Sequence, residues 1–280
     1  MRIIITRNYD EISRKAAKII AEQVRGEPTS ILGLPAGSTP LGVYKELIRM
    51  HKEENLDFSK VITFNLDEYR GFGPEHPKSH HYFMFNTFFN HVNIDPKKTH
   101  IPDGLVKDVE AYCRKYEEEI ENAGGIDLQL LGIGRNGHIG FNEPGSSLAG
   151  RTRLAVLSDE TVKDNARFFQ REEEVPRLVI TMGCGTIMEA KKILLLASGS
   201  DKADAIAATI EGPVTSQVPA SVLQTHPDAT IITDEEAAWK LKKKNYYKYA
   251  EKLEKKRFRN SEGLDTIRLI CKINIGLLQP

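Results

Sequence analysis

The chain has 280 residues, and its 39 lysines and arginines balance its 39 aspartates and glutamates, so the formal net charge is zero. A balanced charge provides no overall field that would attract nucleic acid or an anionic membrane. Three unevenly spaced cysteines without a C-x-x-C pair fit neither a disulfide framework nor a zinc ribbon. The first residues reach charged side chains too soon for a signal peptide, and every apolar run is shorter than the ~20 residues of a membrane span. These features predict a soluble, cytoplasmic protein.

In chain order, short apolar runs alternate with helical patterns. RIIIT precedes YDEISRKAAKIIAEQV, SILGLP precedes TPLGVYKELIRMH, VITFNL precedes SHHYFMFNTFF, and DLQLLGIG follows. RLAVLS then precedes DETVKDNARFF, RLVITMG comes next, KILLLASG precedes SDKADAIAATIEG, and ATIITD precedes EEAAWKLK. Runs that are apolar on both faces suit a parallel sheet with helices on both sides. With right-handed crossovers, the pattern predicts an α/β fold, a doubly wound, mostly parallel sheet in a three-layer α/β/α sandwich.

Residues that commonly cap helices mark several of the expected boundaries. Thr39, followed by Pro40, is the expected N-cap of one helix. Ser79 is the expected cap of the next helix, and Asp108 that of a third. This third helix should end at Gly124, because glycine readily adopts the left-handed conformation found just past many helices.

The composition of the chain changes only near its C-terminus. No internal repeat or low-complexity linker interrupts the alternating pattern before residue 240. Beyond that point basic residues outnumber acidic ones, so a mildly acidic body precedes a basic tail. We expect one α/β domain over residues 1–242 and a basic C-terminal extension over residues 243–280. In this extension, IRLICKINIGLL fits a strand or a packing arm.

The stretch LLGIGRNGHIGFNEPG, residues 130–145, contains the letters G-x-G-x-x-G of a dinucleotide-binding loop. Such a loop must open a helix of about ten residues or more, which Gly140, Pro144 and Gly145 would interrupt. Asp159 stands near the position of a ribose-binding acid, yet an acid that begins a helix needs no ligand to explain it. We therefore expect a Rossmann-like sheet without a dinucleotide site.

Four polar side chains of the same loop suit proton transfer: Asn136, His138, Asn142 and Glu143. An imidazole with its usual pKa near ~6.5 exchanges protons at neutral pH, and a neighbouring acceptor can fix its tautomer and raise its basicity. The alternative is that His138 and Asn142 only satisfy backbone groups of the loop. Because ligands of open parallel sheets bind beyond the carboxyl ends of the strands, where this loop lies, we favour the functional interpretation.

Asp67 and Glu68 follow the run VITFNL, at the carboxyl end of another predicted strand. A carboxylate at this edge is well placed to act as a general base. The alternative is that the two acids cap a helix or close a turn, which is the commoner role of an isolated Asp-Glu pair. The presence of the polar loop at the same edge favours the general base.

The segment AGSTP places a glycine and two hydroxyls, Gly37, Ser38 and Thr39, where a helix is expected to begin. It lacks the G-K-[ST] of a nucleoside triphosphate loop. Free backbone N–H groups and the helix dipole nevertheless favour an anion such as a sugar phosphate there. An ordinary helix cap explains the segment equally well. Lys202, at the start of another helix after a strand, could add a positive charge to such a phosphate, or be solvated.

The histidines outside the polar loop do not form a metal motif. No H-E-x-x-H and no cluster of three ligands occurs, and adjacent residues on a helix point in different directions. We therefore expect no metal site, and surface or loop positions for His76, His80, His81 and His91.

Taken together, LGLPAGSTP, VITFNLDEYRG, LLGIGRNGHIGFNEPGSSLAGRTR, NARFF, PRLVITMGCGTI and SGSDKA resemble the glucosamine-6-phosphate deaminase family. The similarity runs in order from about Met1 to about Lys242. It implies an enzyme of amino-sugar catabolism, a hydrolase acting on a C–N bond. Such an enzyme converts glucosamine 6-phosphate and water to fructose 6-phosphate and ammonia, without metal or organic cofactor.

The resemblance also implies roles for individual residues. Asp67 would take the C2 proton, and His138 would move the proton that opens the pyranose ring. Asn136 and Glu143 would support His138. The substrate would be held by Gly37, Ser38, Thr39 and Lys202 at its phosphate and by Arg167 at another oxygen.

Three positions depart from the family pattern. Asn136 stands where one branch has aspartate, so it can orient His138 but cannot stabilise an imidazolium by charge. Ala36 stands where threonine is common in the phosphate loop. Ala155 replaces a lysine that, with an arginine matching Arg153, helps bind the activator N-acetylglucosamine 6-phosphate in allosteric members. We expect weak or absent activation, in a protein that could be a homo-oligomer.

Two other functions remain open at this stage. A 6-phosphogluconolactonase shares the expected fold and binds a phosphorylated sugar, but hydrolysis of a lactone needs no base at C2. A sugar-phosphate sensor without turnover is the second alternative, against which the intact proton-transfer residues argue. Release of ammonia would distinguish the deaminase from both.

Overall fold

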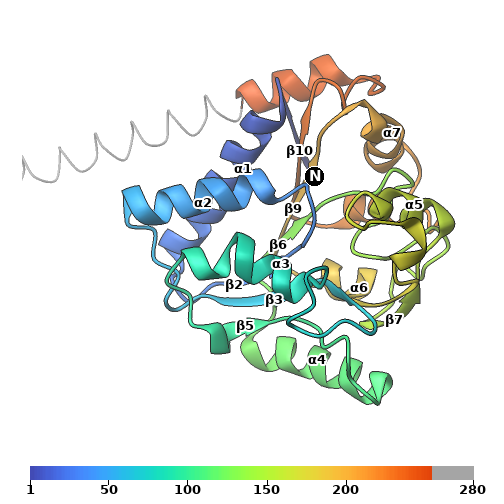
Figure 1. Ribbon diagram of the computed structural model, residues 1–280. Helices are drawn as coiled ribbons and strands as arrows, with labels where there is room; N and C mark the ends of the chain where they lie inside the picture. The colour runs from blue at the N-terminus through green and yellow to red at the C-terminus, as the bar shows by residue number, and fades with distance from the viewer. Residues whose placement is uncertain (254–280) are drawn as a thin grey trace, which may run out of the picture. The chain divides into compact units, whose positions relative to one another are not determined.

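The computed structural model describes residues 1–253, and its body comprises Met1–Lys242 (Figure 1). A separate unit begins at Lys243, and its described part is helical from residue 244 to residue 253. Among residues 1–253, no helix combines the length and apolar composition that crossing a membrane requires.

The body is built on a parallel sheet whose strands lie in the order β1-β10-β9-β6-β2-β3-β5. Each neighbouring pair in this order is parallel, as the apolar runs of the sequence predict for every strand except β5, which none of those runs covers. Helices on both sides make this the expected three-layer α/β/α sandwich. In the order of the sheet, the strands are β1 (Arg2–Thr6), β10 (Ala229–Asp234), β9 (Lys192–Ala197), β6 (Leu128–Leu131), β2 (Ile31–Leu34), β3 (Ile62–Asn65) and β5 (Thr99–His100).

Seven α-helices and five short 3₁₀ helices connect the strands of the body. The α-helices are α1 (Tyr9–Gly26), α2 (Leu41–Glu54), α3 (His80–Thr87), α4 (Val109–Ala123), α5 (Asp159–Ala166), α6 (Cys184–Met188) and α7 (Ala203–Glu211). The 3₁₀ helices are η1 (Phe89–His91), η2 (Pro96–Lys98), η3 (Glu172–Glu174), η4 (Ser200–Lys202) and η5 (Pro219–Thr225).

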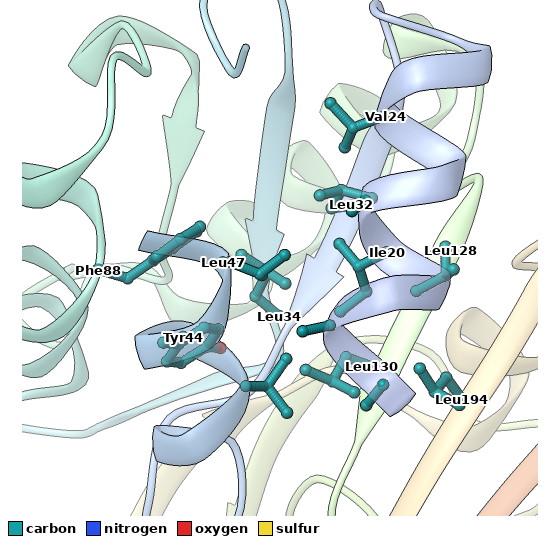
Figure 2. Close-up of a cluster of buried hydrophobic side chains, with 14 of the residues drawn as sticks. Ile20, Val24, Leu32, Leu34, Tyr44, Leu47, Phe88, Leu128, Leu130 and Leu194 are labelled. Carbon is teal, nitrogen blue, oxygen red and sulfur yellow. The ribbon is translucent and has the colours of Figure 1, made fainter. Parts of the chain in front are cut away.

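The main hydrophobic core lies between α1, α2 and one face of the sheet (Figure 2). Apolar residues of both helices recur at helical spacing and are buried against alternate residues of the strands. On the opposite face, Tyr116 of α4 packs edge-on against Phe64 of β3, with 5.7 Å between ring centres. The residues labelled in the core are Ile20, Val24, Leu32, Leu34, Tyr44, Leu47, Phe88, Leu128, Leu130 and Leu194.

A second, smaller sheet is antiparallel and contains two of the apolar runs. RLAVLS and RLVITMG form β7 (Arg153–Val156) and β8 (Leu178–Thr181), which pair with β4 (Asp67–Tyr69) in the order β4-β8-β7. Residues of β7 alternate between partly buried and exposed, so one face of this strand packs against the protein and the other faces solvent. Such alternation is typical of an antiparallel edge strand, whereas a central parallel strand is buried on both faces.

Leu66 joins the two sheets. Its backbone N–H donates to Leu34 O of β2 at 3.2 Å, and its carbonyl accepts from Met182 N, just after β8, at 2.7 Å. The peptide group before Leu66 is therefore hydrogen-bonded to the parallel sheet, and the peptide group after it is hydrogen-bonded to the antiparallel sheet. This connection carries Asp67 directly from the end of the parallel sheet into the antiparallel one.

Most of the predicted helix ends are confirmed. Ser79 and Asp108 accept hydrogen bonds from backbone N–H groups in the first turns of α3 and α4, and Gly124 ends α4 in the left-handed conformation. Thr39 is not a cap, because α2 begins one residue later, after Pro40, without a side-chain cap. The expected helix EEAAWKLK is also wrong, since residues 235–240 form successive turns after β10.

Candidate active site

The predicted site residues gather at one edge of the parallel sheet. Asp67 lies just beyond β3, the polar loop follows β6, Ser38 follows β2, and Lys202 follows β9. These four strands are parallel, and β9, β6, β2 and β3 are consecutive in the sheet. Their carboxyl ends therefore meet at a common edge, where ligands of open α/β sheets bind.

His138, Asn136 and Glu143 form a hydrogen-bonded chain in the polar loop. His138 Nδ1 lies 2.8 Å from Asn136 Oδ1, and Asn136 Nδ2 donates to Glu143 Oε2 at 2.8 Å. Because the amide nitrogen of Asn136 donates to Glu143, its amide oxygen faces His138 and accepts a hydrogen bond from Nδ1–H. A neutral His138 consequently keeps an unprotonated Nε2 that can take a proton from a substrate.

The protonation state of His138 is set by two opposing effects. Burial lowers the pKa of His138, because a charged imidazolium is poorly solvated inside the protein. The negative charge of Glu143, 3.8 Å from Nδ1, opposes burial, while the positive charge of Lys202 adds to it. The net shift of the pKa is downward, so the expected gain in basicity is outweighed and His138 is neutral at pH 7.

Glycines shape the loop so that His138 can turn back onto it. Gly137 has a φ of +84°, which favours glycine, and Gly134 N–H donates to His138 O at 2.9 Å. A Cβ added to Gly134 would lie 2.2 Å from the imidazole ring. Residues 138–152 form no helix, as predicted. The glycines therefore accommodate the ring of His138.

Asn142 has the structural role that the sequence left as an alternative. Its side chain is fully buried, and Nδ2 donates to Ile139 O at 2.9 Å and to Met182 O at 2.8 Å. Its Oδ1 accepts from Arg153 Nη1 at 2.7 Å. All these contacts tie the loop to neighbouring segments, so Asn142 positions the loop that carries His138.

Asp67 and Glu68 have different surroundings. Glu68 is 2% exposed and accepts from Tyr69 N, His80 N and His81 N at 2.8 to 3.0 Å, so it holds the start of α3. Glu68 therefore has the helix-capping role that the sequence left as an alternative. Asp67 is 7% exposed, and its Oδ1 lies 2.8 Å from His80 Nδ1.

His80 corrects the expectation of a surface or loop histidine. It is the first residue of α3, and its side chain is only 14% exposed. Glu68 holds the helix start beside β4, so the ring of His80 meets Asp67 although 13 residues separate them. No local pattern predicts this contact, because it depends on how α3 packs beside β4.

Cationic side chains converge near the start of α2. Arg167 Nη2 donates to Ser38 Oγ at 3.1 Å. The side chain of Lys202 is 19% exposed, and burial, with a smaller contribution from the positive charge of Arg167, lowers its pKa. Gly37 has a φ of +102° and open space where a Cβ would stand, while Thr39 lies beside Gly132 of the polar loop. These residues suit an anionic ligand.

Two further observations concern the location and the ligands of the site. Within the described range, no three His, Cys, Asp or Glu side chains come together in an arrangement that would hold a metal ion. A groove of about 1160 Å³ between α4 and β7 is lined by Arg153 but by none of the proton-transfer residues. We therefore place the candidate site at the carboxyl edge of the sheet.

The chain is similar to known deaminases. The family model of glucosamine-6-phosphate isomerases and 6-phosphogluconolactonases matches residues 6–232. A glucosamine-6-phosphate deaminase from Thermoanaerobacter pseudethanolicus is 60% identical over 238 residues, covering 85% of this chain and 94% of that protein. Another from Halothermothrix orenii is 56% identical over 238 residues, covering 85% and 99%.

Solved structures agree with these relatives. A monomeric glucosamine-6-phosphate deaminase has a TM-score of 0.84 and 45% identity, covering 85% of this chain and 99% of its own. A 6-phosphogluconolactonase from Trypanosoma cruzi has a TM-score of 0.69 at 22% identity, covering 86% and 97%, which shows the fold alone. From the family model and the relatives at 60% and 56% identity, the chain belongs to the glucosamine-6-phosphate deaminases of the glucosamine-6-phosphate isomerase and 6-phosphogluconolactonase family.

Proposed function

We propose that this chain converts glucosamine 6-phosphate and water to fructose 6-phosphate and ammonia, without a metal or organic cofactor. The observation that carries the proposal is the presence of two separate proton-transfer groups, Asp67 and His138, at the same edge of the sheet. The reaction needs two such groups, because the sugar ring must open before C2 becomes acidic. Only an open aldehyde or imine at C1 can delocalise the electron pair that the C2 proton leaves behind.

His138 is suited to ring opening. Its neutral Nε2 can take the proton of the C1 hydroxyl and return a proton to the ring oxygen, which breaks the bond between C1 and that oxygen. Asn136 fixes the tautomer that makes this possible, and Glu143 lies close enough to stabilise the imidazolium that forms. The asparagine needs the help of Glu143, since it carries no charge itself.

Asp67 is suited to the following step. As a carboxylate it can take the proton from C2 and return it to C1, while the oxygen on C1 gains a proton and the amino nitrogen loses one. These transfers convert the aldose into a ketose imine with the double bond between C2 and nitrogen. Water then adds at C2, and ammonia leaves as the C–N bond breaks. The products, fructose 6-phosphate and ammonia, balance the substrate and the water consumed.

The phosphate of the substrate is proposed to bind near the start of α2. Arg167, Lys202 and Ser38 converge there, and Gly37 and Thr39 belong to the same turn. Ammonium and guanidinium groups bind phosphate oxygens strongly, and a phosphate would offset the repulsion between the two cations. In this arrangement Arg167 can contact a further substrate oxygen as well as the phosphate.

The test is ammonia release from glucosamine 6-phosphate by the wild type and by Asp67→Asn. A general base contributes roughly 10²- to 10⁴-fold to a rate, so the variant should lose turnover by that factor while KM changes little. Asp57→Asn is the matched control, because Asp57 precedes β3, at the opposite end of that strand. Near-full activity of Asp67→Asn would exclude Asp67 as the base.

The same assay distinguishes the two other functions. A 6-phosphogluconolactonase would hydrolyse its lactone and release no ammonia from the amino sugar, and a sensor would bind the sugar phosphate without turnover. The hydrogen-bonded chain from His138 to Glu143 favours the deaminase, because binding alone needs no aligned proton-transfer group.

We further propose that residues 1–242 are the deaminase domain and that residues 243–280 lie outside the catalytic part. A cytoplasmic location suits the two cysteines of the described residues, Cys113 and Cys184, which are buried and free. The formation of a homo-oligomer stays a prediction. A mass measurement in solution gives the assembly directly.

A further inference from the structure

His80 contacts the proposed base through a nitrogen that must carry a hydrogen. Its Nδ1 lies 2.8 Å from Asp67 Oδ1 and 3.0 Å from the backbone oxygen of Asp67. Both partners are acceptors, so Nδ1 donates to them in any protonation state of the ring. The carboxylate of Asp67 therefore receives a directed hydrogen bond from His80.

The position of His80 is fixed from several sides. Glu68 accepts from its backbone N–H at 3.0 Å, and Ser79 caps the same helix. The ring lies 5.0 Å from the ring centre of Tyr69 and is stacked at 6.1 Å from Phe141. Such confinement keeps Nδ1 directed at Asp67, because a rotation of the ring would meet these neighbours.

The charges around His80 favour its protonated form. Burial lowers the pKa of His80, but the hydrogen bond and charge of Asp67, with the charge of Glu68, outweigh burial and raise the pKa to about 9. The other titratable groups nearby are Tyr69 and His138. The ring centre of His138 lies 6.2 Å from that of Phe141, the ring on which His80 stacks. His138 is neutral at pH 7, so it does not oppose the charge on His80.

We propose that His80 is a positioning residue for Asp67. Its ring donates a hydrogen bond to the base carboxylate and keeps that carboxylate directed at C2. This inference rests on the proposed function, since it assigns a partner to the base of that reaction. The positive ring and the negative carboxylate also attract each other, which strengthens the hydrogen bond. The hydrogen bond adds a fixed orientation, which proton transfer requires.

Two substitutions separate the charge of His80 from its hydrogen bond. In His80→Asn the amide nitrogen can replace Nδ1 as donor but carries no charge, and in His80→Leu both are lost. His81→Gln is the matched control, because His81 is the next residue of α3 and its ring stacks on Phe85 at 4.5 Å. All three are compared with the wild type by ammonia release across pH.

The expected results differ for each variant. His80→Asn should keep kcat within about 3-fold, because the amide can still donate to Asp67. His80→Leu should lose kcat by roughly 10- to 100-fold with little change in KM. His81→Gln should behave as the wild type. A merely structural role would lower thermal stability and leave kcat of the folded His80→Leu variant near that of the wild type.

An NMR titration of the His80 ring tests the ion pair without relying on activity. The ring should titrate with a pKa of about 9 in the wild type and clearly lower in Asp67→Asn. A wild-type ring that titrates at or below ~6.5 would overturn the inference, as would a wild-type kcat in the folded His80→Leu variant. A wild type that releases no ammonia would instead overturn the proposed function, so the two failures are distinguishable.

Discussion

His138 depends on a carboxylate that acts on it through space and through Asn136. Glu143 Oε2 lies 3.8 Å from His138 Nδ1 and accepts from the amide that orients the ring. The charge of Glu143 opposes the lowering of the His138 pKa by burial. Glu143 therefore combines two functions, orientation by way of Asn136 and charge stabilisation of the imidazolium.

Glu143→Gln separates these two functions at the scale of one residue. The amide oxygen of the new side chain can still accept from Asn136, so the ring should keep its orientation, but the pKa of His138 should fall further because the charge of Glu143 is lost. Because the imidazolium is less stable, kcat should decrease about 10-fold at about pH 7.5. NMR titration of His138 gives the shift, and an unchanged titration with unchanged kcat would show that Glu143 has no electrostatic role.

Among the elements, β7 carries the two residues on which the expected response to an activator depends. Arg153 donates from Nη1 to Asn142 Oδ1 at 2.7 Å and from Nη2 to Ser146 Oγ at 3.2 Å, so its guanidinium is engaged with the polar loop. Ala155, two residues along the same strand, adds no charge. On β7 a phosphorylated activator could therefore contact one cation, Arg153, which is already hydrogen-bonded to the polar loop. The family resemblance implies two cations at these positions in allosteric members.

We therefore expect N-acetylglucosamine 6-phosphate to raise the rate at subsaturating substrate by less than about 2-fold, since a single charge contact contributes little and Arg153 already donates to the polar loop. Initial rates with and without this compound measure the effect. Ala155→Lys is the matched variant, in which a larger response is expected. A strong activation of the wild type would contradict the prediction.

Local patterns predicted those elements whose structure depends on local contacts. Apolar runs predicted the parallel strands, and the caps Ser79 and Asp108 predicted their helices, because the signals lie within a few residues. The position of β7 and β8 depends on pairing with β4, which lies far away in the sequence. RLAV carries no sequence signal for its exposed face, because the residues that are exposed there, Leu154 and Val156, are apolar.

The candidate site was predictable to a similar extent. His138, Asn136 and Glu143 belong to one short loop, so their proximity follows from the sequence. The contact between His80 and Asp67 does not, because it requires Glu68 to hold the start of α3 beside β4. Contacts that depend on the packing of two elements leave no signal in either element alone.

At the scale of the whole molecule, the complete parallel sheet and all proposed site residues lie within Met1–Lys242. A chain that ends at Lys242 should therefore fold and release ammonia with kcat within about 2-fold of the full chain, because it keeps the parallel sheet and every proposed site residue. Circular dichroism and the ammonia assay measure both properties. A folded but inactive truncated chain would show that the basic extension takes part in catalysis.

The junction at Leu66 has a consequence for how such an enzyme can change. The base stands on the antiparallel sheet, whereas the loop of His138 extends from the parallel one, and the backbone of Leu66 is bonded to both. The spacing between the two proton-transfer groups is thus a property of how two sheets meet. Insertions in the surrounding loops can alter substrate preference while this spacing is preserved, so diversification and catalytic geometry are separable in this architecture.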